Sequence, residues 1–192
     1  AGLISTSLAV TGSNGSVQLI AIGEASNFSA AAWTFTNWEA TDFVGISGTA
    51  GADTLTGSLM NDLLLGNANS DILSGLRGSD SLDGGAGTDL AIFNFSDRTQ
   101  DLVFVNRAQA GVTYVATVGG VAAGSVTNVE AISIIGGSGN DHISAALTVT
   151  SPVTTFDGGS GQDVVELDAS ALTGAFSGGL NVLGAGLGGL FY

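Results

Sequence analysis

The chain has 192 residues and carries 17 acidic but only three basic side chains, which gives a formal net charge of −14. This excess of acid argues against nucleic acid and anionic membrane as partners and favours a cation. Cysteine is absent, so an extracellular form of the protein must be stabilised by metal, packing or assembly rather than by disulfides.

The N-terminal region, residues 1–47, is predicted to form β-strands that lead into a regular stack. Two apolar runs, 3–10 and 17–22, flank an Asn14-Gly15 pair, and this arrangement predicts a β-hairpin. Aromatic residues concentrate in 27–47, where their alternation favours another strand. We interpret these aromatic side chains as core and cap rather than as a ligand platform.

Residues 48–92 consist of five nine-residue units in unbroken register. Every unit opens with glycine and has aspartate at its sixth position, and the first four have leucine at the eighth. A fixed period of this kind predicts a stacked architecture. Glycine at positions one, two and four allows positive φ, so that a turn closes with its carbonyls pointing inward. Positions seven to nine predict a short strand with one apolar residue facing the core.

The turns of these units predict a calcium site. Carboxylate and carbonyl oxygens in a flexible cage suit calcium, whereas magnesium requires a stricter octahedron and zinc prefers nitrogen or sulfur. Without a cation, stacked carboxylates would repel one another. The candidate ligands in this segment are Asp53, Asp62, Asp71, Asp80 and Asp89.

The pattern resembles the RTX family of haemolysin-type calcium-binding nonapeptide repeats. The resemblance implies an all-β fold, a parallel β-roll or β-solenoid with flanking strands and hairpins, in which two units form one coil. Asp53, Asp71 and Asp89 would then stack along one edge, and Asp62 and Asp80 along the other.

The second unit departs most from the pattern, because Leu59 and Met60 occupy its turn. Met60 is poorly suited to a left-handed conformation, whereas Asn69 in the third unit is well suited to it. The site that includes Asp62 therefore matches the pattern least well.

Residues 93–135 are predicted to form connecting strands, at 102–105, 112–118 and 131–135. Their last part repeats an earlier motif, because Thr127-Asn-Val-Glu-Ala131 matches Thr36-Asn-Trp-Glu-Ala40. The repetition predicts that the chain contains two diverged copies of one module. Glu39 and Glu130 occupy matching positions in the motif, which suggests a structural role such as capping.

Residues 136–168 are predicted to form a second, degenerate roll. Its two units contain Asp141 and Asp163, which lie 22 residues apart, so that a slightly bulged coil would stack them and add one more site. Asp83 and Asp157 are additional candidate ligands. We expect about four calcium ions in all, two oxygen-rich turns enclosing each.

The segment 169–192 contains no charged residue and seven glycines, and we interpret it as an assembly or secretion segment. Its glycine content and the lack of a basic flank argue against a transmembrane helix, so no membrane insertion is expected.

Catalysis is not expected. The chain contains no HExxH zinc motif, no GxSxG nucleophile elbow and no cysteine nucleophile. The single histidine, His142, occupies position seven of a calcium unit, where its side chain is predicted to point outward.

Two functions fit the sequence. One is an extracellular structural protein that folds on secretion, by a type I system, and assembles with copies of itself into a surface layer, filament or matrix. Cell-surface polysaccharide is a further candidate partner. The alternative, implied by the family resemblance, is the C-terminal calcium-binding and secretion domain of a larger RTX exoprotein such as a lipase, protease or adhesin.

Overall fold

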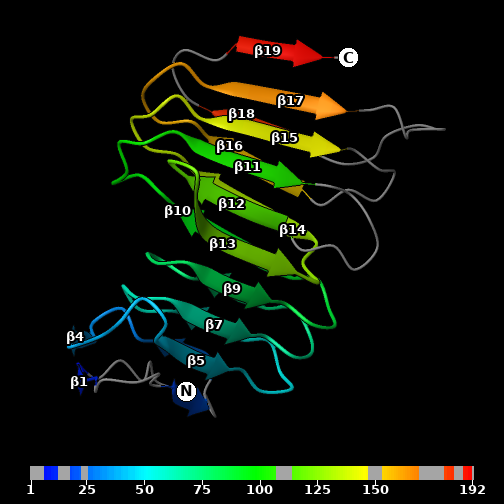
Figure 1. Ribbon diagram of the computed structural model, residues 1–192. Helices are drawn as coiled ribbons and strands as arrows, with labels where there is room; N and C mark the ends of the chain where they lie inside the picture. Colours follow the sequence, from blue (N-terminus) through cyan, green and yellow to red (C-terminus); the bar gives the residue numbers. More distant parts are fainter. Residues whose placement is uncertain are drawn as a thin grey trace.

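The computed structural model describes residues 7–12, 18–22, 26–106, 114–146, 153–168, 180–183 and 188–191. In this part the chain winds as a solenoid of β-strands, with the N-terminal strands at one end of the stack and the C-terminal strands at the other (Figure 1). These residues include no helix long and apolar enough to cross a membrane. The strands and their mostly parallel pairing confirm the predicted all-β roll.

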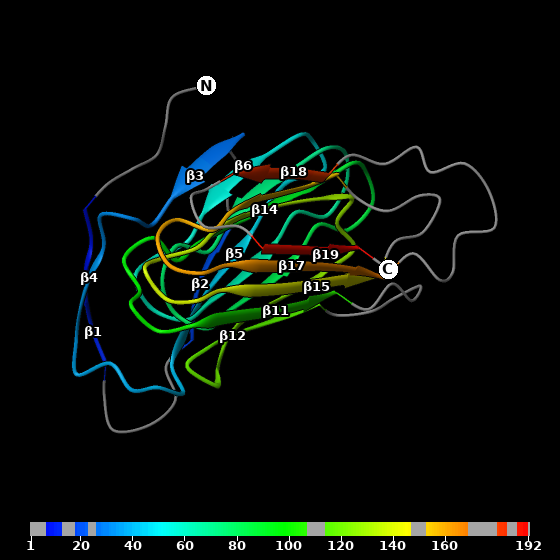
Figure 2. The ribbon, with the colours of Figure 1, turned by 90° about the horizontal axis from the view of Figure 1, so that it is seen from above.

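Two long sheets form opposite walls of the solenoid, which Figure 2 shows from above. The seven-stranded sheet is parallel throughout and contains, in spatial order, β3 (Asn27–Ser29), β6 (Thr54–Thr56), β8 (Ile72–Ser74), β10 (Leu90–Asn94), β14 (Ala131–Ile135), β16 (Val153–Asp157) and β18 (Leu180–Leu183). The ten-stranded sheet contains, in spatial order, β2 (Gln18–Ile22), β5 (Phe43–Ser47), β7 (Asp62–Leu65), β9 (Asp80–Asp83), β13 (Val121–Thr127), β12 (Tyr114–Val118), β11 (Leu102–Asn106), β15 (His142–Ala146), β17 (Val164–Asp168) and β19 (Gly188–Phe191).

The first strands do not form the predicted hairpin. Strand β1 (Ala9–Thr11) pairs in parallel with β4 (Thr34–Thr36), and β2 pairs in parallel with β5. Each N-terminal strand therefore pairs with the next coil of the solenoid rather than with its neighbour in sequence. The Asn-Gly pair was a misleading signal, because β1 and β2 each find a parallel partner in a later strand. Residues 13–17, which include this pair, lie outside the described part.

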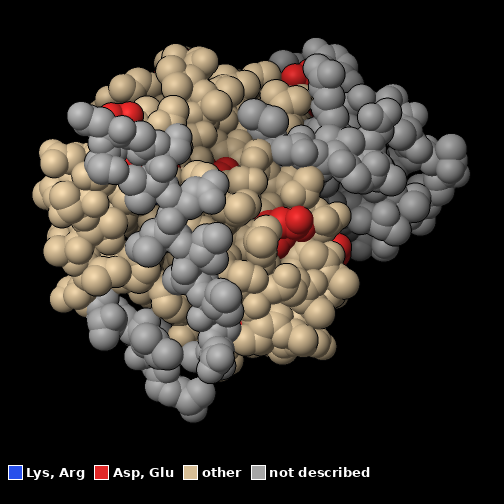
Figure 3. Space-filling view, turned by 60° about the horizontal axis from the view of Figure 1, so that its bottom comes forward, with Lys and Arg blue, Asp and Glu red and all other residues tan. Residues whose placement is uncertain are grey.

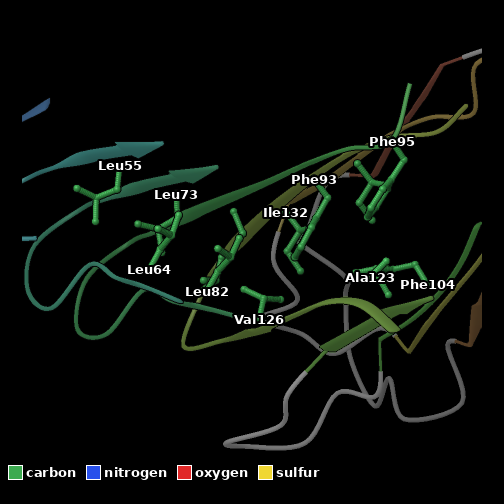
Figure 4. Packing of buried hydrophobic residues seen from close by; sticks show 14 of the residues in the cluster. Leu55, Leu64, Leu73, Leu82, Phe93, Phe95, Phe104, Ala123, Val126 and Ile132 are labelled. Atoms are coloured by element: carbon green, nitrogen blue, oxygen red, sulfur yellow. The ribbon is translucent and has the colours of Figure 1, made fainter. Parts of the chain in front are cut away.

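The nonapeptide units form regular coils in which a residue stacks on the one 18 positions later. Position eight faces inward in every strand, as predicted, and its leucines form a ladder along the core (Figure 4). Each of these side chains is fully buried, and burying one stabilises the fold by about 2 kcal/mol. The ladder consists of Leu55, Leu64, Leu73 and Leu82.

An antiparallel insertion interrupts the ten-stranded sheet. A regular coil would place one strand between β9 and β15, but β13, β12 and β11 all lie there, with antiparallel pairing between β11 and β12 and between β12 and β13. The seven-stranded sheet has no such insertion, since β10 pairs directly with β14. Strands β11, β12 and β14 correspond to predicted ones, whereas β13 was not predicted.

Phenylalanines replace leucine in the core at the insertion. Phe93 packs against Phe95 and Phe104 with ring centroids 6.0 and 6.4 Å apart (Figure 4). Two extra strands add about 10 Å to one wall, so larger side chains are needed to fill the space behind them. Gly124 in β13 is required here, because a Cβ at this position would lie 2.7 Å from the Phe93 ring.

The candidate calcium-binding turns

The turns that join the two sheets stack in two columns, one on each edge of the solenoid. Column 1 leads from the ten-stranded to the seven-stranded sheet and column 2 leads back. Within the described residues, column 1 contains turns 48–53, 66–71, 84–89 and 128–130, and column 2 contains turns 57–62, 75–80, 95–101, 136–141 and 158–163.

Aspartates at the sixth position form hydrogen-bonded ladders within each column. In column 1 the backbone N–H of Asp53 donates to Oδ1 of Asp71 at 2.8 Å, and the N–H of Asp71 donates to Oδ1 of Asp89 at 2.8 Å. In column 2 the N–H of Asp62 donates to Oδ1 of Asp80 at 3.0 Å. The structure thus brings together the aspartates predicted to stack.

The second roll continues column 2 in the same way. The N–H of Asp141 donates to Oδ1 of Asp163 at 3.0 Å, across a coil of 22 residues. Strands β15 and β17 pair in parallel on the same register, so the longer coil is accommodated without loss of stacking. All seven sixth-position aspartates of the two rolls are at most 4% exposed.

The first glycine of each unit makes room for the carboxylate. A Cβ on Gly48 would lie 2.6 Å from Oδ2 of Asp53 and 2.9 Å from the carbonyl oxygen of Gly66, one coil further on. The arrangement repeats at the first glycine of later units. None of these first glycines has the positive φ that the sequence suggested, so their role is steric rather than conformational.

The turns fall into two conformational groups. In the leading turns, 48–53, 57–62 and 136–141, no residue has a positive φ, and the N–H of the second residue donates to the unit's own Asp Oδ2. In the following turns, 66–71, 75–80, 84–89 and 158–163, the second residue is left-handed. These second residues are Asn67, Leu76, Gly85 and Gly159, with φ between 69° and 94°.

Where the second residue is left-handed, its N–H does not donate to the aspartate of the same unit, and one oxygen of that carboxylate faces the interior of the turn. Among the following turns, Asp71, Asp89 and Asp163 each have a buried Oδ2 without a hydrogen-bond partner. A buried charge without a partner is costly, so these oxygens need a cation or a proton.

Burial also shifts the pKa values of aspartates in both columns. Desolvation raises the pKa of Asp62 to about 7, against hydrogen bonds from Ser58 that lower it. Desolvation and the nearby charge of Asp62 raise the pKa of Asp80 to about 8, although the Arg98 guanidinium opposes this rise. Burial likewise raises the pKa of Asp71, Asp89 and Asp141.

The turn geometry fits calcium. Oδ2 of Asp71 and the carbonyl oxygen of Gly84 lie beside the same glycine, Gly66, so a carboxylate and a carbonyl converge between two stacked turns. Nowhere in the described residues do three Asp, Glu, His or Cys side chains converge as a metal site. The remaining ligands must therefore be backbone oxygens, a donor set that calcium accepts and zinc does not.

Two additional candidates and the histidine lie outside the ladders. Asp83 and Asp157 are half-buried at strand ends, where Asp83 accepts a hydrogen bond from the Asn128 side chain and Asp157 from the Gly159 N–H. His142 lies half-exposed on β15, and its Nε2 is 3.4 Å from a carboxylate oxygen of Glu166.

The sequence indicates a polar turn at 97–101 but did not predict that loop 95–101 stacks in column 2 with the calcium turns. The carbonyl oxygens of Arg98 and Gln100 abut Gly137 and Gly139, as the carbonyls of one calcium turn abut the glycines of the next. The N–H of Leu102 donates to Oδ1 of Asp141 at 2.8 Å, so Leu102 occupies the aspartate position. No glycine pattern marks this loop, and only its place in the stack identifies it.

The ladder contact of the exposed Glu130 and the burial of Asp42 were not predicted. The Glu130 carboxylate accepts a 2.9 Å hydrogen bond from the Asp89 N–H and so extends the column 1 ladder. Glu39, its counterpart in the repeated motif, is exposed like Glu130, but its N–H donates to the buried Asp42 carboxylate. The motif itself signalled Glu130, and Asn37 and Asn128 share a left-handed φ of 54° and 50°.

Comparison with known proteins agrees with this geometry. The family model of the RTX calcium-binding nonapeptide repeat, in four copies, matches residues 46–59, 56–91 and 133–146. No curated protein and no solved structure gives a significant match to the chain. The unit at 158–163 lies outside the matched segments, although its turn stacks on the unit at 136–141. By their stacked aspartate turns and this match, residues 46–91 and 133–146 are RTX calcium-binding nonapeptide repeats.

Proposed function

We propose that the protein is an extracellular structural protein that takes up calcium on secretion, by a type I system, and then assembles with copies of itself. The product is a surface layer, filament or matrix, with cell-surface polysaccharide as an additional partner. The role is structural rather than catalytic.

The observation that carries this proposal is the open ends of the two sheets. Within the described residues, β2 and β3 at one end and β18 and β19 at the other each pair on one side only. All four are edges of parallel pairs, so the β18 and β19 edges of one copy match the β3 and β2 edges of the next. Edge strands of this kind add further strands readily unless charge, proline or a bulge blocks them.

The charge distribution supports the same conclusion. Residues 1–23 and 169–192 contain no Asp, Glu, Lys or Arg, so none of the outermost strands β2, β18 and β19 carries a blocking charge. The end of the molecule turned forward in Figure 3 is mostly tan, with a few acidic side chains and no basic ones among the described residues. Contact between ends by a fixed translation along the stack leads to an open filament or lattice.

Calcium provides the switch in this proposal. At low calcium the buried carboxylates repel and the glycine-rich turns lose much backbone entropy on ordering, so the unfolded chain that a secretion channel needs is favoured. At millimolar calcium outside the cell, binding free energy becomes folding free energy and creates the strand edges.

Sedimentation velocity and electron microscopy in 5 mM calcium and in excess chelator test the proposal. We expect polymers only with calcium, and monodisperse folded monomers at millimolar calcium would overturn it. That monomer would instead favour a calcium-binding domain of a larger exoprotein.

A matched pair of proline variants locates the contact. Neighbouring residues of a strand direct their N–H groups to opposite sides, so one of Asn181→Pro and Val182→Pro removes an outward N–H of β18 and the other an N–H directed at β16. The outward variant should fold with calcium but polymerise poorly. Normal polymerisation of both variants would contradict assembly through this edge.

A further inference from the structure

We propose that column 1 holds a further calcium site, between turn 84–89 and the three-residue turn 128–130. Asn128 and Glu130 lie outside the segments that match the repeat family. The inference rests on calcium binding by the repeats and is independent of assembly.

Turn 128–130 takes the place of a calcium turn in the stack. Leu90 is in register with Ala131, so Glu130 stands opposite Asp89 where a regular unit would place its aspartate. The Asp89 N–H donates to Glu130 at 2.9 Å, as the Asp71 N–H donates to Asp89. Because the turn is three residues shorter than a regular one, the longer glutamate side chain reaches the position that aspartate occupies elsewhere.

The carbonyl column continues through the same turn. In regular turns, the first carbonyl of the next unit lies beside the first glycine and its aspartate, as the Gly84 oxygen does at Gly66. At Gly84 the Asn128 carbonyl oxygen takes this role, beside Oδ2 of Asp89. Asn128 also has the left-handed φ, at 50°, that the second residues of the following turns share. The oxygen arrangement is therefore that of a regular interval.

A buried oxygen in this interval lacks a partner. Asp89 is 1% exposed, and its Oδ2 accepts no hydrogen bond. Glu130 and Asp83 add further negative charge nearby, while the described arginines, Arg77 and Arg98, both lie beside Asp97 on column 2. Two carboxylates and backbone carbonyls form the oxygen-only donor set that binds calcium.

The site has a specific structural consequence. It lies at the level where the ten-stranded sheet receives its antiparallel insertion and where β10 meets β14. A cation there joins the first roll to the second through the uninterrupted seven-stranded sheet, so the two rolls fold as one unit.

Calcium stoichiometry of the full chain tests the proposal. Glu130→Gln keeps the hydrogen-bond acceptor for Asp89 but removes the charge, and Glu39→Gln is the matched control, because Glu39 is equally exposed and occupies the equivalent motif position. Equilibrium dialysis with elemental analysis should show one calcium fewer per chain in Glu130→Gln, and an unchanged number in Glu39→Gln. An unchanged number in folded Glu130→Gln would overturn the site.

Anomalous diffraction from wild-type crystals grown in calcium provides a second measurement that does not depend on a variant. A calcium peak is expected between Gly84 and Asn128 in addition to peaks at regular turns. Peaks at regular turns alone would refute this site and leave calcium binding intact, whereas no peak anywhere would refute calcium binding itself. Neither result depends on whether the chain polymerises.

Discussion

The leading and following turns share one sequence pattern but satisfy their carboxylates differently. In leading turn 48–53, Oδ2 of Asp53 accepts the Thr49 N–H at 2.7 Å, whereas in following turn 66–71 the corresponding oxygen of Asp71 has no donor. The difference arises from one residue, because a left-handed second position turns its peptide away from the carboxylate. Leading turns thus close by hydrogen bonding, and following turns need a cation.

Calcium removal should have the largest effect, because it leaves three of the four following turns with a buried carboxylate oxygen that has no hydrogen-bond partner. We expect the β-sheet circular dichroism signal to be lost in excess chelator at pH 8 and restored cooperatively by calcium. Magnesium at equal concentration is the control, since its octahedral geometry fits these cages poorly. A substantial β signal that persists in chelator would show that hydrogen bonds alone hold the turns closed.

The second prediction compares Asp71 with Asp53. Asp71 takes part in two intervals of column 1, toward Asp53 and toward Asp89, whereas Asp53 takes part in one regular interval. We expect Asp71→Asn to lower the unfolding free energy in calcium by about 3 kcal/mol. Asp53→Asn should cost less than half as much, because Thr49 still satisfies its side-chain oxygen. Urea denaturation at fixed calcium measures both values, and equal losses would remove the distinction between the two groups.

The stacking of these aspartates was predicted well, because the nine-residue period and the inward leucines depend on local spacing and the family resemblance implied two units per coil. The sequence did not predict which turns lead and which follow. Asn67 did not mark its turn as a following one in the sequence. Leucine ordinarily avoids the left-handed conformation that Leu76 adopts. The conformation of a turn depends on which turn precedes it in the column, and that is a property of the three-dimensional stack.

The antiparallel insertion between the two rolls could not be predicted from the sequence either. Strand β13 lacks a repeat signature, and its partner β9 precedes it by about forty residues. Nothing local distinguishes an antiparallel insertion from a further coil. Phe93 and Phe104 are buried in the core, but the extra width that they fill becomes visible only in the sheet order.

The third prediction concerns protons, which can neutralise the carboxylates when calcium is absent. Folding raises the pKa of Asp62 to about 7 and that of Asp80 to about 8, from 3.8. The folded apo protein therefore binds protons more tightly than the unfolded chain, and its stability should rise as the pH falls from about 8 toward 4. Each titrating carboxyl contributes about 1.4 kcal/mol per pH unit within its window.

Calcium-depleted protein should accordingly regain part of its β signal between pH 8 and pH 5. The variant Asp80→Asn, which is neutral at every pH, should show a smaller dependence. With calcium bound the carboxylates stay ionised, so saturating calcium should flatten the profile. An apo protein that loses structure on acidification would contradict the assignment of these buried carboxyls.

The smallest expected effect separates the two turn groups by backbone strain. Leu76, at the second position of following turn 75–80, has a φ of 69°, whereas Met60 in leading turn 57–62 does not have a positive φ. The sequence had marked Met60 as the misfit, yet its turn does not require a left-handed residue. Leu76→Asn should stabilise the calcium-bound protein by about 1 kcal/mol, because asparagine adopts this conformation more readily.

Met60→Asn is the matched control, and it should bring no gain. The comparison is informative because both side chains lie in neighbouring turns of column 2 and both are half-buried. Urea midpoints at saturating calcium measure the two changes. If Met60→Asn stabilised the protein and Leu76→Asn did not, the left-handed conformation would belong to the leading turn. The division into turns closed by hydrogen bonds and turns closed by calcium would then be wrong for column 2.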